Sequence, residues 1–469
     1  MKIKHINARE ILDSRGRPTV EVDLAIERAD GAITLGRASA PSGASVGSRE
    51  AIELRDLNDN RYFGYGVRTA ISNVRNIIAP RLISATNVEG RTFSNALDGI
   101  CTTAHSDADV SMAQIYLDDI LLSIYNELAV GSNAILPVSL AFAKAMAKMH
   151  KIPLFIMIRW LLLTIQNRLN IGYEFKEMSR YTRPIKERQA NRPGSEIAFP
   201  IPMLNLVNGG AHASNSLDIQ EFMIVPVGAA TIADALRMAS EIFMTLQKNL
   251  KTIGHNTNIG DEGGFASGFT STRSALDGLM EAIYQCGYTD SVKLALDAAS
   301  SEFYKDDKYQ MQGEGLLLKS SMLIKYYEAL IRDYPIISIE DAMAENDWLG
   351  WQDITAALGD KIMLVGDDLF TTNEETLQYG IENGAANAIL IKPNQVGTLT
   401  DAIKTIALAM SSGYQPIISH RSGETEDTTI AHLAYGVGSP YIKAGSICRT
   451  DRLCKYNEML RIAEYNSTV

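Results

Sequence analysis

The chain has 469 residues, of which 46% are hydrophobic and 21% are charged. These proportions are ordinary for a folded globular protein of two or three domains, and they exclude a disordered or fibrous chain. The net charge of −11 at pH 7 argues against nucleic acid as a partner, because a phosphate backbone binds a basic surface.

The cysteines and the apolar segments indicate in which cellular compartment the protein is expected. Cys101, Cys286, Cys448 and Cys454 form no CxxC pair and no disulfide framework, which fits a reducing compartment. The opening residues lack an apolar stretch, so we expect no signal peptide. The most apolar segment, residues 152–165, is shorter than the ~20 residues that a membrane span needs. We therefore expect a cytoplasmic protein without a membrane span.

The first part of the chain predicts a small α+β domain. Residues 19–26 alternate between apolar and polar side chains, the pattern of a half-buried antiparallel strand. Asp30-Gly31 supplies a turn, and residues 33–39 can return as the partner strand. Three helical patterns follow, at residues 66–86, 111–129 and 133–150. We expect these elements to form an N-terminal domain over residues 1–145.

Two segments show no regular pattern. Residues 40–48 are small and include two glycines, which fits a solvated connector or a mobile lid that offers oxygen atoms to a ligand. Residues 158–196 carry many Arg and Lys side chains but no motif. A surface insertion is the simplest interpretation, and a basic partner-binding patch is the alternative. We expect that a short linker can replace residues 160–194 without loss of chemistry.

The second part of the chain opens with two predicted strands. Residues 205–212 end a strand in a glycine turn that contains a histidine, and another strand begins within residues 219–224. A helix follows, in which apolar residues from 232 to 250 recur at steps of three and four. Residues 260–264 then put two carboxylates, one of them Glu262, among glycines that let a ligand approach the backbone. Alone, such a motif is more often a turn than an acid catalyst.

Five apolar runs between residues 293 and 421 each stop at an ionisable residue. The last three spacings, about 25–28 residues each, fit one strand, one helix and two loops. Continuous apolar runs are typical of strands buried on both faces, and the C-terminal ends of such strands carry the sites of barrels. We therefore predict a barrel over residues 146–469. The residues expected at its mouth are Asp297, Glu340, Asp367, Lys392 and His420-Arg421.

Three of these five positions are carboxylates, which indicates a metal. Taken singly, an acidic residue after an apolar run is usually a loop start or a helix cap. A series of this length favours a shared site instead. Converging carboxylates would repel one another without a cation, and their oxygen atoms suit a hard divalent ion such as Mg²⁺.

Together with their flanking residues, these positions resemble the enolase family, and the resemblance extends over nearly the whole length of the sequence. The matching stretches are residues 8–16, 42–45, 208–212, 220–224, 260–264, 338–341, 367–368, 391–395, 419–427 and 442–443. The resemblance implies an α/β protein with a smaller α+β N-terminal domain. A C-terminal (β/α)8-type barrel follows, with atypical first strands.

The resemblance also implies an activity, the reversible Mg²⁺-dependent dehydration of 2-phosphoglycerate to phosphoenolpyruvate in glycolysis and gluconeogenesis. Enolase-superfamily enzymes use a Lys or His base with one or two Mg²⁺ ions. Two Mg²⁺ ions are implied for each active site here, the second recruited with the substrate. A homodimer or higher homo-oligomer is implied as well, with residues 9–15 near the interface.

Finally, the resemblance assigns roles to residues of this sequence. The metal ligands would be Asp297, Glu340, Asp367 and Ser45. The catalytic residues would be the general base Lys392, the general acid Glu262, and Glu221 and His212. Nearby positive charge would keep the base deprotonated. The residues holding the substrate would be His212, Gln220, Glu221, Lys392, His420, Arg421, Ser422 and Lys443.

The sequence departs from the family pattern at positions that are not predicted ligands or catalytic groups. They are Val46, Pro137, Ala342, His432 and Ala444. Two other interpretations stay open: a binding relative that keeps the fold without catalysis, and a related enzyme for a non-phosphorylated acid. The intact acid, base and carboxylates disfavour the first, and the cations of residues 420–422 and 443 disfavour the second.

Overall fold

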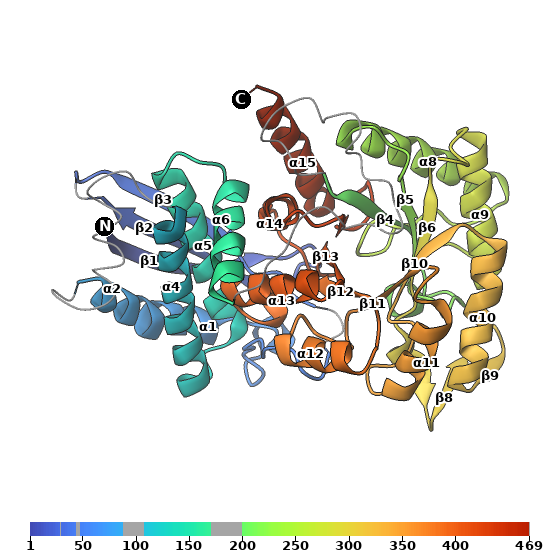
Figure 1. The fold of residues 1–469 in the computed structure, drawn as a ribbon, viewed down its shortest axis with the longest axis horizontal. Coiled ribbons are helices and arrows are strands. Elements are labelled where there is room, and N and C mark those ends of the chain that lie inside the picture. Colours follow the sequence, from blue (N-terminus) through green and yellow to red (C-terminus); the bar gives the residue numbers. More distant parts are fainter. Residues whose placement is uncertain (29, 44–46, 88–106, 170–198, 469) are drawn as a thin grey trace.

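The structure is a computed structural model that describes residues 1–28, 30–43, 47–87, 107–169 and 199–468. Figure 1 shows a smaller domain of strands and helices beside a larger barrel. The N-terminal elements form the smaller domain, and the elements from residue 199 onward form the barrel. The predicted fold class, an α/β barrel preceded by an α+β domain, is confirmed.

An antiparallel sheet in the order β1-β2-β3 opens the N-terminal domain. Its strands are β1 (Lys2–Leu12), β2 (Pro18–Glu27) and β3 (Ile33–Ser39). The predicted strand pair is confirmed, and β1 extends it. Helix α5 (Ser132–Met149) packs on β2 and β3. The approach is close, since a Cβ at Gly36 would lie 1.8 Å from the Ala141 carbonyl oxygen, so only glycine fits there.

The predicted helices of this domain are confirmed with shifted ends. Arg61–Gly64 forms a 3-10 turn (η1) ahead of them. The helices are α1 (Arg68–Asn73), the π-helical turn η2 (Val74–Ile78), α2 (Ala79–Asn87), α4 (Asp107–Leu128), α5 and α6 (Leu154–Arg168). Residue 145 lies inside α5, so the domain boundary predicted there stays a prediction.

Helix α6 corrects the prediction of a surface insertion over residues 158–196. The helix packs against α4 and α14 (Thr429–Val437). Its buried side chains within the predicted insertion include Ile158, Leu161, Leu162 and Ile165. Replacing residues 160–194 by a linker would remove the part of this packing made by residues 160–168, and the expectation that the chemistry survives stays a prediction. The rest of the predicted insertion, residues 170–196, lies outside the described part of the chain.

Eight strands close into a barrel in the order β10-β11-β12-β13-β14-β4-β5-β6. They are β4 (Ile201–Asn208), β5 (Glu221–Val225), β6 (Lys293–Asp297), β10 (Ile336–Glu340), β11 (Met363–Gly366), β12 (Ala388–Ile391), β13 (Gln415–Ser419) and β14 (Tyr441–Lys443). Strand β5 runs antiparallel to β4 and β6, and the remaining neighbours run parallel. The expectation of atypical first strands is therefore confirmed.

Helices surround this barrel (Figure 1). They are α8 (Ile232–Thr252), α9 (Thr272–Gln285), α10 (Ser320–Asp333), α11 (Trp348–Leu358), α12 (Glu374–Glu382), α13 (Leu399–Ser411), α14 and α15 (Thr450–Thr468). A small sheet of β7 (Tyr304–Lys305), β8 (Lys308–Met311) and β9 (Leu316–Leu318) precedes α10. This sheet accounts for the long spacing between Asp297 and Glu340.

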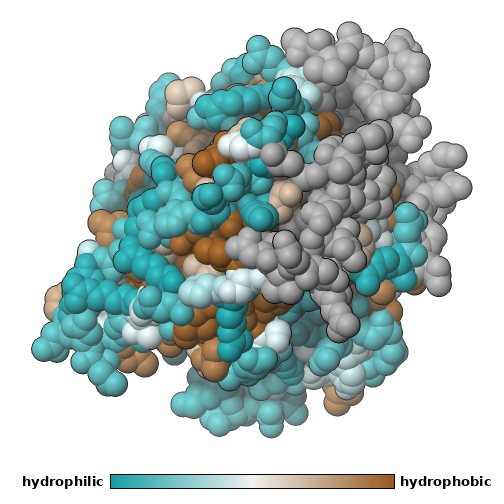
Figure 2. All heavy atoms as spheres, turned by 90° about the vertical axis from the view of Figure 1, so that its left-hand side faces the viewer, coloured by the Kyte–Doolittle hydropathy of each residue, from teal (hydrophilic) through white to brown (hydrophobic). Residues whose placement is uncertain are grey.

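Apolar side chains fill the inside of the barrel, among them Met223, Val365, Leu390 and Tyr441. Within the described ranges, no helix combines the length and the apolar character that crossing a membrane requires. Figure 2 shows the side of the molecule that carries the N-terminal domain. Hydrophilic residues cover most of it, and hydrophobic residues gather near the middle of the view.

A buried carboxylate joins the N-terminal domain to the barrel. Asp118 of α4 accepts hydrogen bonds from the backbone N–H and the hydroxyl of Thr400, at 3.0 and 2.6 Å, in the first turn of α13. The Gln114 amide also donates to it, at 3.1 Å. Asp118 is fully buried, and burial raises its pKa to about 6 in spite of these neutral donors.

The Asp118→Asn variant should change how stability depends on pH. Because the pKa of Asp118 is higher in the folded protein than its ordinary 3.8, its contribution to stability is full below pH 4 and is lost as the pH rises through 6. Two pKa units correspond to about 3 kcal/mol. Urea unfolding at pH 4.5 and 7.5 should therefore show a smaller loss of stability with pH in the variant. If the wild-type protein and the variant lost equal stability between the two pH values, the assignment of Asp118 as a buried group that ionises in this range would be contradicted.

Candidate active site

One cavity of about 30 Å³ collects most of the predicted site residues at one end of the barrel. This volume holds about one or two water molecules. The predicted residues that line it are His212, Gln220, Glu221, Glu262, Asp297, Asp367, Lys392, His420, Arg421, Ser422 and Lys443. Glu340 lies beside the cavity in contact with Lys443. Ser45 lies outside the described residues.

Strand direction explains how these residues meet. Asp297, Glu340 and Lys443 are the last residues of parallel strands, and such ends share one edge of a barrel. Glu221 is the first residue of β5, yet it pairs in register with Asp297 because β5 runs in the opposite direction. The first residue of the antiparallel strand β5 therefore joins a site that is otherwise built from the C-terminal ends of strands.

The Lys443 ammonium lies at the centre of three carboxylates. Its Nζ is 2.9 Å from Asp297 Oδ2, 2.8 Å from Glu340 Oε2 and 3.3 Å from Glu221 Oε1. Burial lowers the pKa of Lys443, but these carboxylates raise it well above its ordinary value. Lys443 therefore carries a full charge, and the carboxylates balance it.

Lys392 contacts the Asp367 carboxylate. Burial lowers the pKa of Lys392, and Asp367 more than offsets this, so the pKa is raised. The Asp367 carboxylate thus offsets the nearby positive charge, because it lies closer to the amine than the cations do. The expectation that positive charge keeps this amine deprotonated stays a prediction.

Asp367 also belongs to a group of carboxylates whose oxygens lie within 4.8 Å of one another, together with Asp341 and Asp368. Asp341 is held by the backbone N–H groups of residues 367 and 368, at 2.9 and 3.0 Å. Burial and the Asp367 carboxylate raise the pKa of Asp368 to about 7. Such crowded oxygen donors fit a hard divalent cation. Asp297 and Glu340 are outside this group, since their carboxylates turn to Lys443.

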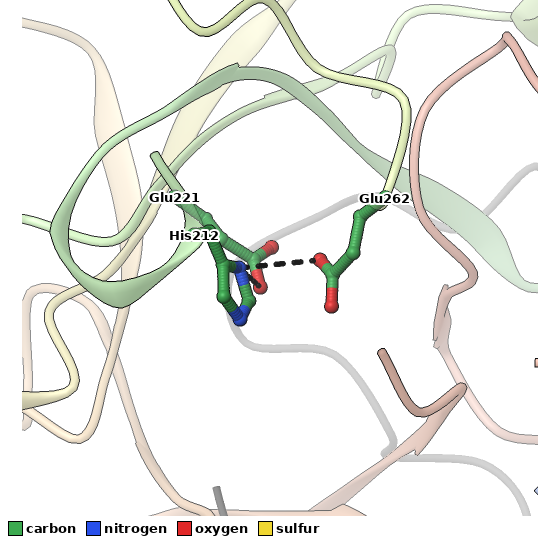
Figure 3. A group of neighbouring side chains, drawn as sticks. All are labelled: His212, Glu221 and Glu262. Carbon is green, nitrogen blue, oxygen red and sulfur yellow. Dashed lines mark ion pairs between the residues drawn. The ribbon is translucent and has the colours of Figure 1, made fainter. Parts of the chain in front are cut away.

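A second group contains His212, Glu221 and Glu262 (Figure 3). His212 Nδ1 lies 3.7 Å from Glu221 Oε1 and 3.7 Å from Glu262 Oε2, while Glu262 Oε1 accepts a hydrogen bond from the Ser422 hydroxyl at 3.1 Å. Burial and the Glu262 charge raise the pKa of Glu221 well above its ordinary value. Glu262 is equally buried, yet the neighbouring His212, His420, Arg452 and Lys443 side chains lower its pKa. A proton in this group is therefore held more strongly by the Glu221 carboxyl than by the Glu262 carboxyl.

Arg421 is paired with a residue that the sequence analysis missed, Glu50. The two side chains make contacts of 2.7 Å (Nη1 to Oε2) and 3.2 Å (Nη2 to Oε1), and both are about 95% buried. The Gln395 amide and the Gly47 N–H also donate to Glu50, at 3.2 and 3.0 Å. The Arg421 guanidinium, which is predicted to hold the substrate, is thus paired with a carboxylate of the same chain.

Helix α15 braces the loop that carries residues 420–422. Arg452 is fully buried and donates to the carbonyl oxygens of Arg421 and Ser422, both at 2.6 Å. It also contacts His420 Nδ1. Because a guanidinium can only donate, Nδ1 must accept, and the imidazole proton sits on Nε2. That nitrogen lies 3.6 Å from Glu262 Oε2. Arg452 is therefore a positioning residue for this loop.

Several site residues were missed for different reasons. The cavity is also lined by Glu50, Ala299, Glu302, Asp341, Asp368 and Ser419. Asp341 and Asp368 each directly follow a predicted metal ligand, so doubled acidic residues at strand ends were a usable signal. Glu50 follows the small-residue run of 40–48 without a motif of its own. No sequence pattern identified Arg452, because a position in a helix does not indicate which loop the side chain contacts.

The positions that depart from the family pattern are found in varied surroundings. Ala342 and Ala444 are fully buried, and Pro137 lies inside α5. His432 Nε2 lies 3.0 Å from Glu458 Oε1 of α15. Val46 is outside the described residues.

Two family models match the chain. The model of the enolase N-terminal domain matches residues 3–158, and the model of the enolase C-terminal TIM barrel domain matches residues 196–468. Together the two matches cover most of the chain, in the expected order.

Replacing Glu50 by Gln should strengthen the binding of inorganic phosphate in the absence of substrate. The Arg421 guanidinium would lose its internal anion, and one charge-assisted hydrogen bond is worth about 1.5–3 kcal/mol, or roughly 10-fold or more in affinity. Isothermal titration calorimetry measures the change. Glu53→Gln is the matched control, because Glu53 pairs with Arg55 instead. An unchanged affinity in Glu50→Gln, or an equal gain in the control, would contradict this pairing.

Proposed function

The chain belongs to the enolase family, and we propose that it catalyses the reversible, Mg²⁺-dependent dehydration of 2-phosphoglycerate to phosphoenolpyruvate. One observation carries this proposal: Lys392, Glu262 and Arg421 line the same cavity. A base, an acid and a cation suited to an anion thus lie close enough together to act on one small phosphorylated substrate, for which the cavity must widen. We further propose a role in glycolysis and gluconeogenesis, a cytoplasmic location and at least a homodimer, on the family resemblance and the cysteine pattern.

Mg²⁺ is the cation that this family generally requires. Asp297, Glu340 and Asp367 would hold the first ion, and Ser45 would contribute to a second that arrives with the substrate. The donor set fits, because all of these ligands are oxygens and lysine ammonium groups already lie against the carboxylates. When bound, Mg²⁺ stabilises the extra negative charge that forms on the substrate carboxylate.

Lys392 would act as the base that removes the proton from C2. A protonated amine cannot accept a proton, so Lys392 must first release the Asp367 carboxylate. The pKa of Glu262 is lowered, so Glu262 must first take up a proton, which the neighbouring Glu221 can supply. The C3 hydroxyl would then leave as water after receiving that proton from Glu262. Glu221 would support this step, since its pKa is raised by burial and by the Glu262 charge within the same buried group.

The remaining polar residues of the cavity would hold the substrate. The planar guanidinium of Arg421 suits a bidentate contact with phosphate, and Glu50 must turn aside for it. Ser422, Gln220, His212, His420 and Lys443 line the same cavity and would fix the orientation of the rest of the molecule. Orientation matters because the base and the acid act on different carbon atoms.

Chelation should abolish the dehydration of 2-phosphoglycerate, and added Mg²⁺ should restore it. The Asp367→Asn variant should bind Mg²⁺ at least about 10-fold more weakly, because a neutral amide is a poorer ligand for a hard dication. A coupled absorbance assay follows the first effect, and calorimetry follows the second. Full turnover in excess chelator would sink the proposed reaction, and an unchanged Mg²⁺ affinity would count against Asp367 as a ligand.

Mutation should separate the base from the acid. Glu262→Gln cannot donate a proton, so phosphoenolpyruvate formation should fall by about 10²–10⁴-fold while the C2 proton still exchanges with deuterium. Lys392→Ala should lose both reactions. Proton NMR in D2O measures the exchange. Glu302→Gln, at another glutamate of the same cavity, controls for the lost charge. Exchange that survives in Lys392→Ala but vanishes in Glu262→Gln would mean that the two roles are reversed.

A further inference from the structure

The loop that carries Glu262 folds back on itself. The Gly260 N–H donates to the Gly264 carbonyl oxygen at 2.8 Å, and the Ser446 N–H donates to the Glu262 carbonyl oxygen at 2.9 Å. These bonds hold the loop together and attach it to the segment after β14. They do not connect it to Glu221, which comes from β5. The place of the Glu262 carboxyl relative to Glu221 therefore depends on what else packs against the loop.

Two asparagines of β4 pack against this loop. Asn205 and Asn208 are fully buried, and the Asn205 amide donates to Asn208 Oδ1 at 2.6 Å. A Cβ at Gly264 would lie 2.6 Å from Asn208 Oδ1, and a Cβ at Gly260 would collide with Asn208 Nδ2. The Asn208 amide therefore meets the backbone of the loop at two points, where glycine leaves enough space for it.

Asn208 also borders the segments that carry His212 and Glu221. It pairs in register with Glu221 across β4 and β5. Its carbonyl oxygen accepts a hydrogen bond from the Asn215 amide at 2.9 Å, and Asn215 lies in the connection between the two strands, which also carries His212. Figure 3 shows His212, Glu221 and Glu262 turned toward one space from separate segments. Asn208 thus contacts all three of these segments.

We propose that Asn208 is a positioning residue, which sets where the Glu262 carboxyl lies relative to Glu221 and His212. The inference rests on the proposed function, because it concerns the residue assigned there as the acid. Among the described residues, Asn208 is not one of those that line the cavity, so it acts through the loop and not on the substrate. Its amide matters because a shift of about 1 Å in a catalytic group can cost about 10²-fold in rate.

Asn208→Ala should separate the two halves of the reaction. Dehydration needs Glu262 in place and should fall by about 10–100-fold, since the loop can shift into the space of the lost amide. Exchange of the C2 proton needs Lys392 and should stay within about threefold of the wild-type rate. The coupled assay and proton NMR in D2O measure the two rates. Asn208→Ser, which also lacks the amide, is the second variant and serves if Asn208→Ala does not fold.

Asn387→Ala is the matched control. Asn387 Oδ1 accepts from the Leu364 N–H at 2.8 Å, and its amide donates to the Gly359 and Ile362 carbonyl oxygens at 2.9 and 3.0 Å. It directly precedes β12, at the opposite end of the barrel from the cavity. Its loss should lower stability and leave the ratio of dehydration to exchange unchanged. An equal change of this ratio in the control would overturn the role of Asn208, because lost stability alone would explain it.

The contact between Asn208 and the loop is tested apart from activity. Gly260→Ala should destabilise the protein, because the added Cβ collides with Asn208 Nδ2. Asn208→Ala makes room for that Cβ, so the double variant should lose less stability than the sum of the two single losses. Urea unfolding of the three variants measures this coupling. Losses that simply add would refute the contact on which the proposal depends.

The outcomes separate this inference from the proposed function. A wild-type protein that neither dehydrates 2-phosphoglycerate nor exchanges its C2 proton refutes the proposed function, and the role of Asn208 falls with it. If the wild type is active and a folded Asn208→Ala variant loses both rates equally, or keeps both, the positioning role alone is overturned. Circular dichroism of each variant checks that it is folded.

Discussion

Buried carboxylates at the mouth of the barrel must be matched by positive charge, and the rest of the site depends on how this is done. Lys443 contacts Glu221, Asp297 and Glu340, while Lys392 contacts Asp367. An uncompensated buried charge would cost several kcal/mol. The lysines therefore allow the acidic mouth to form in the folded protein before any ligand arrives. They also make the site a network of buried ion pairs.

The sequence predicted the part of the site that follows from strand direction. Asp297 and Glu340 are the last residues of parallel strands, and Asp367 and Lys392 directly follow such strands. A run of apolar residues that stops at an ionisable one indicates such an end. The rule would miss Glu221, which begins a strand. Only the resemblance to a family identified it, because no local pattern of five residues reveals that β5 runs antiparallel.

The parts that were wrong or missed depend on contacts between distant segments. Glu50 reaches Arg421 across 371 residues of chain, and Arg452 reaches His420 from a helix. Neither contact has a spacing that sequence could reveal. Helix α6 was taken for part of an insertion because of its arginines. Its aliphatic side chains such as Leu161 and Leu162 are buried, while long charged side chains at helix edges are tolerated.

Because helix α15 is near the C-terminal end of the chain, it affects when one loop of the site is supported during synthesis. Arg452 and Lys455 hold the loop of residues 420–425, through the Arg421, Ser422 and Thr425 carbonyl oxygens. Both follow every residue that lines the cavity. On a ribosome the N-terminal domain can fold as soon as its residues emerge. The barrel then has all of its strands, but the loop of residues 420–425 gains its support from Arg452 and Lys455 only when helix α15 has been made.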